Sequence, residues 1–403
     1  MNRREFVLAT IALSMQACSS RHGPLLLNPC DSGLPAELRD DPLVQDALEG
    51  IDASLLWDGH VHLIGTGDSN SGIWLNPRMQ RFYYMKEFLQ FKFYLNAACA
   101  DQKRVDLSFV ERLLALQKEM PYKSKVLLLA FDYTYNEKGE CEKDLSAFHT
   151  PNDYAARTAS EHPQQFEWIA SIHPYRKDAA EAVYAAFEKK ARAVKWLPPA
   201  MGMDPASPLC DAFYEAMHAC NLPLLVHAGE EKAVHGANKQ DYGNPLRLRR
   251  ALEQGARVIV AHCASLGDSV DIESDKQELL SSFNLFTRLM EEKDYEGLLF
   301  GEISALTQIN RLGDALNTLL LRQDWHARLL NASDYPLPAV MPLFSLRKMI
   351  NKGYITEQQG QVLGNIRQYN ALFFDLLLKR MLRFKGQRFQ DVVFASRRVF
   401  EPA

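Results

Sequence analysis

The chain of 403 residues is 47% hydrophobic and 24% charged, which is ordinary for a globular protein and fits one large domain or two of average size. Its 46 basic and 50 acidic residues give a net charge of −4, without the basic excess expected of a nucleic-acid-binding protein. Beyond the extreme N-terminus, no apolar run approaches the ~20 residues of a membrane-spanning helix.

The first residues have the pattern of an export signal. Arg3 and Arg4 precede a mostly apolar stretch, residues 7–17, that is too short for a membrane anchor. The run from Asn2 to Leu8 resembles a twin-arginine signal, and Cys18 resembles the lipid-modified cysteine of a bacterial lipoprotein. These features predict a signal peptide over residues 1–17 and a protein exported to the bacterial periplasm, with a membrane contact only through a lipid on Cys18. A mildly apolar N-terminus without a sorting role is the alternative.

The remaining chain alternates between strand and helix patterns. Residues 18–54 are rich in Pro, Gly, Asp and Ser, which is typical of a linker or an N-terminal arm. From residue 55, eight apolar runs of strand type are separated by stretches with helical spacing, as in a parallel sheet buried on both faces. A (β/α)8 barrel needs ~250 residues, so it fits this length with extensions. The runs are Leu55–Leu63, Lys125–Tyr135, Phe166–Tyr175, Ala191–Pro199, Leu222–Gly229, Ala256–Ser265, Leu298–Leu306 and Ala327–Pro336.

Several helix boundaries are predicted between the runs. Residues 178–190 are rich in Ala and Glu and end in two lysines, which suit a helix C-terminus. Asn244 and Pro245 have the order of an N-cap and a first helical residue, and Gly255 is expected to end that helix. The long gap after the first run holds an aromatic-rich stretch, residues 82–94, which predicts an inserted helix on the barrel or over its mouth.

The seven cysteines show no metal-binding spacing. If Cys18 carries a lipid, six remain, without CxxC or zinc-ribbon patterns. An exported protein can form disulfides, but the sequence does not pair these residues, and most are expected to be small buried side chains.

Metal-ligating side chains follow several of the predicted strands. The first run ends in His60 and His62, the fifth in His227, the sixth in His262 and the eighth in Asp334. Alternate strand residues share one face, so His60 and His62 are expected to point together into the barrel mouth, where such enzymes place their chemistry. Three histidines and a carboxylate suit zinc and leave a position for water, which the ion activates. Asp334 could bind the metal and accept the proton of that water, while His262 could polarise a substrate carbonyl or bind a second ion.

These residues, in this order, resemble the amidohydrolase superfamily and, within it, the amidohydrolase-2 family. The resemblance spans residues 55–373, and residues 374–403 are then a C-terminal extension. It implies a (β/α)8 TIM barrel and a catalytic divalent metal, zinc in one copy or two, held by His60, His62, His227 and Asp334, with catalytic roles for Asp334 and His262. Lys195, in the strand-four segment, is either a carbamylated bridge between two metals or an ordinary lysine that contacts the substrate or a carboxylate.

Other polar residues near strand ends have weaker patterns. His173, which precedes a proline, is expected to be structural, and His235 could line the mouth. Glu302 and Asp132 are possible inward-facing residues, but both are predicted to be solvated or salt-bridged carboxylates. Charged or polar loop residues could hold an anionic substrate, although solvation is the usual role of such residues: Arg176, Lys177, Lys232 and Tyr133.

The leading hypothesis is therefore an enzyme, a metal-dependent hydrolase that acts on an amide, a lactone or a related carbonyl in a small-molecule substrate. A metal-dependent decarboxylase or hydratase on the same scaffold is the first alternative. A phosphodiesterase of the metal-dependent deoxyribonuclease type is disfavoured, because that family prefers Glu where this chain has Lys195. The hypothesis from another class is a non-catalytic envelope lipoprotein. The specific substrate and the oligomeric state are not determined by the sequence.

Overall fold

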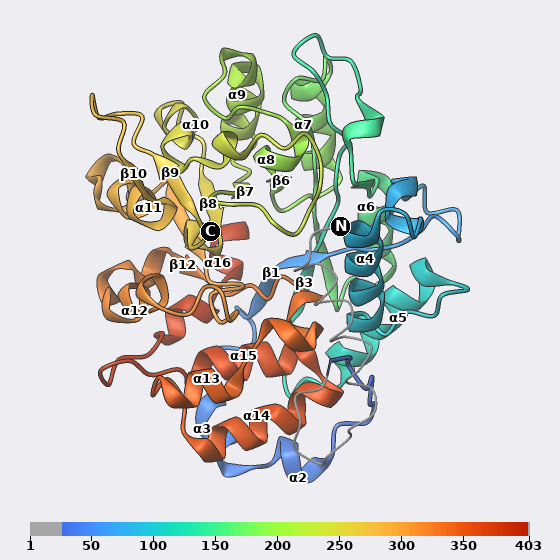
Figure 1. Cartoon of the computed structure of the whole chain (residues 1–403), viewed down its shortest axis with the longest axis vertical. Helices are drawn as coiled ribbons and strands as arrows, with labels where there is room; N and C mark the ends of the chain where they lie inside the picture. Colours follow the sequence, from blue (N-terminus) through green and yellow to red (C-terminus); the bar gives the residue numbers. More distant parts are fainter. Residues whose placement is uncertain (1–25, 402–403) are drawn as a thin grey trace.

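A computed structural model describes residues 26–401 of the chain (Figure 1). Its central parallel strands fall within the eight apolar runs and form one sheet of three and one of five. The five-stranded sheet has the order β12-β11-β8-β7-β6, and the three-stranded sheet has the order β1-β3-β5. The strands are β1 (Trp57–His62), β3 (Lys125–Leu129), β5 (Phe166–Ile169), β6 (Val194–Trp196), β7 (Leu224–His227), β8 (Val258–Ala261), β11 (Leu299–Glu302) and β12 (Leu329–Leu330).

Two parallel bridges join the sheets into a closed ring. Ala170, just after β5, pairs with Val194 of β6, and Val61 of β1 pairs with Tyr335, beyond β12. At the second junction His62 N donates to Tyr335 O over 3.0 Å, and Asp334 N donates to His60 O over 2.8 Å. The eight parallel strands, joined in this order by the two bridges, form the predicted (β/α)8 barrel.

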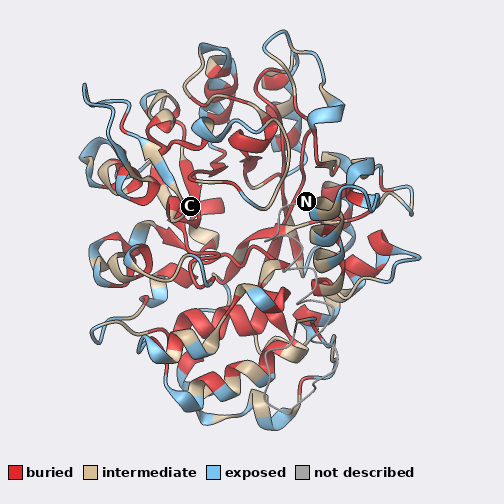
Figure 2. Ribbon diagram, viewed as in Figure 1, coloured by how far each residue is buried: buried red, intermediate tan, exposed pale blue. Residues whose placement is uncertain are grey.

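Helices surround the strands, and the apolar side chains between the strand layer and the helix layer are buried (Figure 2). The barrel helices are α5 (Val105–Lys118), α6 (Asn152–Glu161), α7 (Ala179–Glu188), α9 (Asp211–Ala219), α10 (Arg249–Glu253), α11 (Ser282–Glu291) and α12 (Asp314–Leu321). Further helices are α2 (Ala36–Arg39), α3 (Pro42–Leu48), α4 (Met85–Ala97), α8 (Pro198–Met201), α13 (Leu346–Asn351), α14 (Glu357–Tyr369), α15 (Ala371–Met381) and α16 (Arg397–Phe400). Two short antiparallel pairs lie outside the barrel: β2 (Trp74–Leu75) with β4 (Phe148–His149), and β9 (Asp268–Val270) with β10 (Leu279–Ser281).

The helix boundaries predicted from local signals are close to those observed. The Asn244 side chain accepts from Leu246 N over 3.1 Å and caps a 3-10 turn, Pro245–Leu248, which leads into α10. The segment predicted over residues 178–190 is α7, and the aromatic-rich stretch is α4. Helix α15 continues across residue 373, where the sequence placed the start of a C-terminal extension.

The N-terminal arm is packed against the body of the protein. Val44 and Leu48 of α3 are buried, and the Arg380 guanidinium of α15 donates to Ala47 O over 2.7 Å. Helices α2 and α3 lie beside α14 and α15 at the bottom of Figure 1. The predicted signal peptide and Cys18 lie outside the described residues. Within residues 26–401, no helix is both long and apolar enough to cross a membrane.

The cysteines behave in part as expected. Cys210, Cys220 and Cys263 are buried, whereas Cys141 is exposed. Cys30 and Cys99 form a disulfide that joins the arm to the end of α4, a pair that the sequence could not assign.

The C-terminal residues close the bottom of the barrel. Val399 and Phe400 of α16 pack against Trp57 and the other inward-facing strand residues. Gly59 leaves room for this contact, because a β-carbon there would lie 3.0 Å from the Phe400 ring.

We expect Phe400→Ala to lower the free energy of unfolding by about 3–5 kcal/mol, because the substitution leaves a cavity under the barrel. Phe187→Ala on α7 is the matched control, since Phe187 is 50% exposed, and its cost should stay within about 0.5 kcal/mol. Denaturant unfolding of the two variants measures the difference. Equal costs would show that α16 does not support the barrel.

Candidate active site

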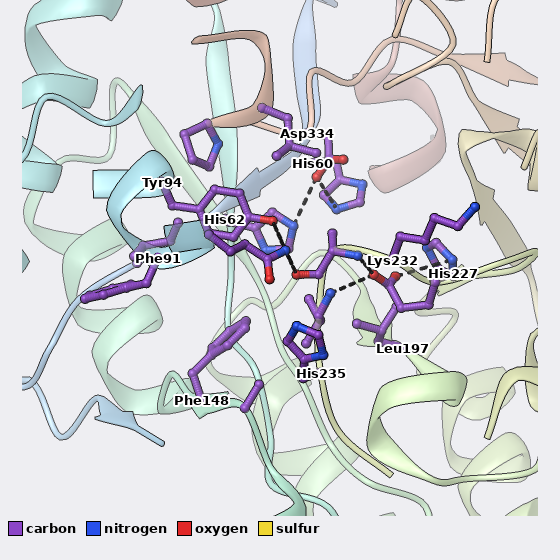
Figure 3. A pocket seen from close by; sticks show the side chains of 18 of the residues that line it. His60, His62, Phe91, Tyr94, Phe148, Leu197, His227, Lys232, His235 and Asp334 are labelled. Atoms are coloured by element: carbon purple, nitrogen blue, oxygen red, sulfur yellow. Dashed lines mark hydrogen bonds and ion pairs between the residues drawn. The ribbon is translucent and has the colours of Figure 1, made fainter. Parts of the chain in front are cut away.

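A cavity of about 250 Å³ opens at the C-terminal end of the barrel strands. The predicted metal ligands line it, and His60, His62, His227 and Asp334 are labelled in Figure 3. Its wall is completed by α4 and by the loops that follow β7, β11 and β12. The predicted site residues among its lining are His60, His62, Lys195, His227, His262 and Asp334.

A register shift in β1 decides which face His60 and His62 occupy. Trp57 packs inside the barrel, and strict alternation from it would turn both histidines outward. The pairing of β1 with β3 shifts between Asp58 and Val61, and Val61 packs with the helix layer instead. A bulge reverses the alternation, so both imidazoles face the cavity.

His60, His62 and Asp334 form the tightest group of metal-ligating atoms at the mouth. Asp334 Oδ1 lies 3.0 Å from His62 Nε2 and 3.4 Å from His60 Nε2. One ligand atom from each of the three residues lies within 4.8 Å of the others. Asp334 has φ = 60°, a backbone conformation uncommon outside glycine, and the hydrogen bond from its N to His60 O supports it there.

Glu302, at the end of β11, orients two of the histidines. Its Oε1 accepts from His60 Nδ1 over 3.1 Å and from His262 N over 2.9 Å. An ionised carboxylate can only accept, so His60 carries its proton on Nδ1 and turns an unprotonated Nε2 toward Asp334. Glu302 is 1% exposed. The prediction that Glu302 is a solvated or salt-bridged carboxylate is wrong. Closure of the barrel buries this side chain, and the imidazoles around it are neutral.

His262 has an equally defined orientation. Its Nδ1 lies 2.6 Å from Ser304 Oγ, which in turn donates to Glu302 over 2.8 Å. Ser304 therefore accepts from His262 Nδ1–H, and His262 Nε2, 3.7 Å from Asp334 Oδ2, is unprotonated. His262 and the next two residues have φ values of 55°, 49° and 49°, a left-handed turn of non-glycine residues that stores strain at the site.

His227 lies at the same mouth but outside the tightest group. Its Nε2 is buried, has no hydrogen-bond partner among the described residues, and lies 3.4 Å from Glu231 Oε2. Glu231, which was not among the predicted site residues, also accepts from Val234 N over 2.8 Å. The sequence did contain a signal for it, because Glu231 follows His227 by four residues in the loop after β7.

Burial controls the charge state of the cluster. It lowers the pKa of His227 to about 3 and places the pKa values of His60 and His262 well below the ordinary value, so all three are neutral at pH 7. Burial alone would raise the pKa of Asp334, but the hydrogen bond from His62 and the positive charge of Lys195 help to hold that pKa below its usual range. The site thus offers neutral imidazoles and an ionised carboxylate.

Two cations without an ion-pair partner in the described chain face the cavity, in addition to Lys232, which is paired with Glu230. Lys195 is 2% exposed, and burial lowers its pKa to about 8. Arg311, in the loop after β11, donates to Ser265 Oγ over 2.9 Å, while its buried Nε has no partner among the described residues. Neither side chain forms an ion pair within residues 26–401, so both charges are available to a bound anion. Arg311 was not predicted as a site residue, since its loop carries no motif.

The other predicted candidates are divided between the cavity wall and the rest of the fold. His173 is buried and bonded to Met201 O, as expected of a structural residue, and Asp132 forms an ion pair with Arg176, as predicted. Lys232 and His235 line the cavity. Three candidates for substrate contacts are not among the cavity residues: Arg176, Lys177 and Tyr133.

A cluster of half-buried Asp58 with the buried Lys379 and Asp375 supports the strand ends from behind. Asp58 Oδ1 accepts from Ser333 N over 2.8 Å and from His60 N over 3.3 Å. Lys379 of α15 donates to Ala332 O and to Asp375. These bonds hold the two backbone segments that carry His60 and Asp334.

The donor set fits a divalent metal ion. The buried Nε2 atoms of His60 and His227 lack hydrogen-bond partners, although buried polar atoms normally have them. A cation between these atoms and Asp334 would satisfy them. The alternative group of His60, His262 and Glu302 fits less well, because Glu302 already accepts four hydrogen bonds from protein groups.

Comparison with known proteins gives one family match. The model of a family described as amidohydrolase matches residues 57–278, just over half of the chain and including β1 through β8. No curated protein matches the sequence.

Among solved structures, a 5-carboxyvanillate decarboxylase from Novosphingobium aromaticivorans with bound manganese is 12% identical, with a TM-score of 0.47. The similarity covers 81% of this chain and 96% of that one. A probable 2-pyrone-4,6-dicarboxylic acid hydrolase from Acinetobacter baumannii, with citric acid bound, is also 12% identical, with a TM-score of 0.43. That match covers 79% of this chain and 97% of the other.

Proposed function

Since the chain belongs to the amidohydrolase family, we propose that it is a metal-dependent hydrolase that cleaves an amide, a lactone or a related carbonyl compound. The observation that carries the proposal is the meeting of His60, His62 and Asp334 at the carboxyl ends of the barrel strands. His227, with its unpartnered Nε2, is the proposed fourth ligand. A zinc-type ion held there would supply Lewis acidity toward water and toward a carbonyl oxygen.

The protein groups then have distinct roles. Asp334 is ionised and accepts the proton of the attacking water. His262 presents an unprotonated Nε2, which suits a second proton acceptor or ligand better than a donor to a carbonyl oxygen. Glu302 keeps the Nε2 of His60 turned to the site.

Lys195 and Arg311 support the second candidate, a metal-dependent decarboxylase. Both cations face the cavity without a carboxylate partner in the described chain, so they could bind the carboxylate that such a reaction removes. A hydrolase would use the same two groups to hold an acidic part of its substrate. A panel of amides, lactones and aromatic carboxylic acids separates the two, because only the decarboxylase releases carbon dioxide.

The metal content tests both candidates. We expect protein prepared without chelators to contain about one zinc-like ion per chain by elemental analysis. If Lys195 is carbamylated, the content should be two ions and should fall in Lys195→Ala. Absence of stoichiometric metal under metal-replete conditions would contradict the proposed chemistry. The hypothesis of a non-catalytic envelope lipoprotein would then remain.

A further inference from the structure

An exposed aromatic ridge lies at the edge of the catalytic cavity. Phe82, Tyr83 and Tyr84 precede α4, and Leu89 lies in its second turn; their exposed fractions are 63%, 93%, 39% and 38%. Exposed apolar side chains are common when single, but a consecutive group of large ones indicates a contact surface. We call these four residues the ridge.

The ridge is surrounded by positive charge. Residues 77–92 contain four cations and a single acid, Glu87, in a chain whose net charge is −4. None of the four cations forms an ion pair within the described chain. Two of them instead lie over aromatic rings, Arg78 at 5.4 Å from the Tyr84 centroid and Lys92 at 5.6 Å from that of Phe88. The four are Arg78, Arg81, Lys86 and Lys92.

The inner face of the same segment forms part of the cavity wall. Met79, Phe91 and Tyr94 line the cavity, and Phe91 and Tyr94 are labelled in Figure 3. A surface that held the ridge would therefore lie beside the cavity entrance.

The start of the described chain lies on the same helix. Asn28 N donates to Asn96 Oδ1 over 2.8 Å, and Cys30 is bonded to Cys99, so the chain leaves the body at the C-terminal end of α4. Ten Cα-to-Cα steps separate Cys18 from Asn28 and can span roughly 35 Å, whereas the 13-residue α4 is about 20 Å long. An N-terminal anchor and the ridge can thus reach one planar surface.

We propose that this edge of the barrel docks on an anionic lipid bilayer. The aromatic rings lie at the level of the headgroups, the four cations face lipid phosphates, and the cavity opens beside the lipid surface. Amphipathic rings flanked by Lys and Arg are typical of membrane interfaces. A protein partner is less favoured, because a standard interface involves about 20–30 residues on each side. The inference goes beyond the proposed chemistry and does not depend on it.

Vesicle flotation tests the proposal on the full chain with Cys18→Ala, which removes the predicted lipid site. The triple variant Phe82→Ser, Tyr83→Ser, Leu89→Ser should bind vesicles of equal parts phosphatidylglycerol and phosphatidylethanolamine at least about ten-fold more weakly. The matched control, Tyr184→Ser with Phe187→Ser on α7, removes another exposed aromatic pair and should change binding less than two-fold. Each of the four cations should increase the affinity for anionic vesicles about five-fold. Added salt should therefore weaken binding, and neutral phosphatidylcholine vesicles should be bound more weakly than anionic ones.

A second measurement separates the contribution of the ridge to vesicle binding from that of the N-terminal residues, because those residues are the same in all these variants. Tyr83→Trp should give blue-shifted emission when the anionic vesicles are added, and Tyr184→Trp should not. Unchanged flotation of the triple variant together with unshifted Tyr83→Trp emission overturns the proposal. So does equal binding to neutral and anionic vesicles. Self-association of the parent that is lost in the triple variant, with flotation unchanged, would assign the ridge to a second copy of the chain instead.

Discussion

Replacing Asp334 by asparagine is expected to reduce turnover by about 10²–10⁴-fold, the contribution of a positioned general base. Asparagine keeps the size of the side chain and one oxygen for the metal, but it cannot accept a proton at neutral pH. The low pKa of Asp334 means that the wild-type carboxylate is already ionised there. Because the loss concerns the proton transfer, KM should change much less than kcat.

Glu230→Gln is the control for this experiment. Glu230 also lines the cavity, but its side chain is 38% exposed and paired with Lys232, so neutralising it should leave kcat nearly unchanged. Near-normal turnover of Asp334→Asn on an identified substrate would show that another group accepts the proton. His262, with its unprotonated Nε2 near Asp334, would then be the first residue to replace.

Replacing Glu302 by glutamine should weaken metal binding by about 10–100-fold, the usual effect of losing a carboxylate that orients a histidine ligand. Glu302 accepts from His60 Nδ1 and His262 N through one oxygen, and from Ser304 N over 2.6 Å through the other. Glutamine can match only one of these oxygens, and its amide group would face a donor. His60 would also lose the negative charge that makes its Nε2 a stronger ligand.

Metal titration followed by elemental analysis measures the effect. The control is Asp132→Asn, which neutralises another buried carboxylate, in the loop after β3, whose partner Arg176 lies outside the cavity. Both variants should lose stability, since each removes charge-assisted hydrogen bonds, but only Glu302→Gln should lose metal affinity. Equal metal affinity in the two variants would mean that Glu302 supports the fold and not the ligands.

Much of the fold was predictable from the sequence, because its signals are local. A parallel strand buried on both faces must be apolar along its whole length, and the eight strands lie in eight such runs. The cap at Asn244 and the inserted helix α4 were likewise encoded by neighbouring residues. The Cys30–Cys99 pair was not, since sequence spacing carries no information about which thiols meet.

The candidate site divides in the same way. The order of His60, His62, His227, His262 and Asp334 along the chain was enough to predict that each side chain lies at one rim, since the carboxyl ends of barrel strands converge there. The order of these residues could not reveal the bulge in β1 that turns His60 inward. That bulge depends on how Trp57 and Gly59 pack over Phe400.

By itself, the sequence determined the fold class and the identity of the donors, because burial patterns and side-chain chemistry belong to short segments. The tertiary structure alone decided which groups control those donors. Glu302 reaches His60 only when β11 and β1 come together across the closed barrel, and the path of one loop brings Arg311, rather than Arg176, to the cavity. Such contacts join residues far apart in the chain, and their geometry is set by closure of the whole ring.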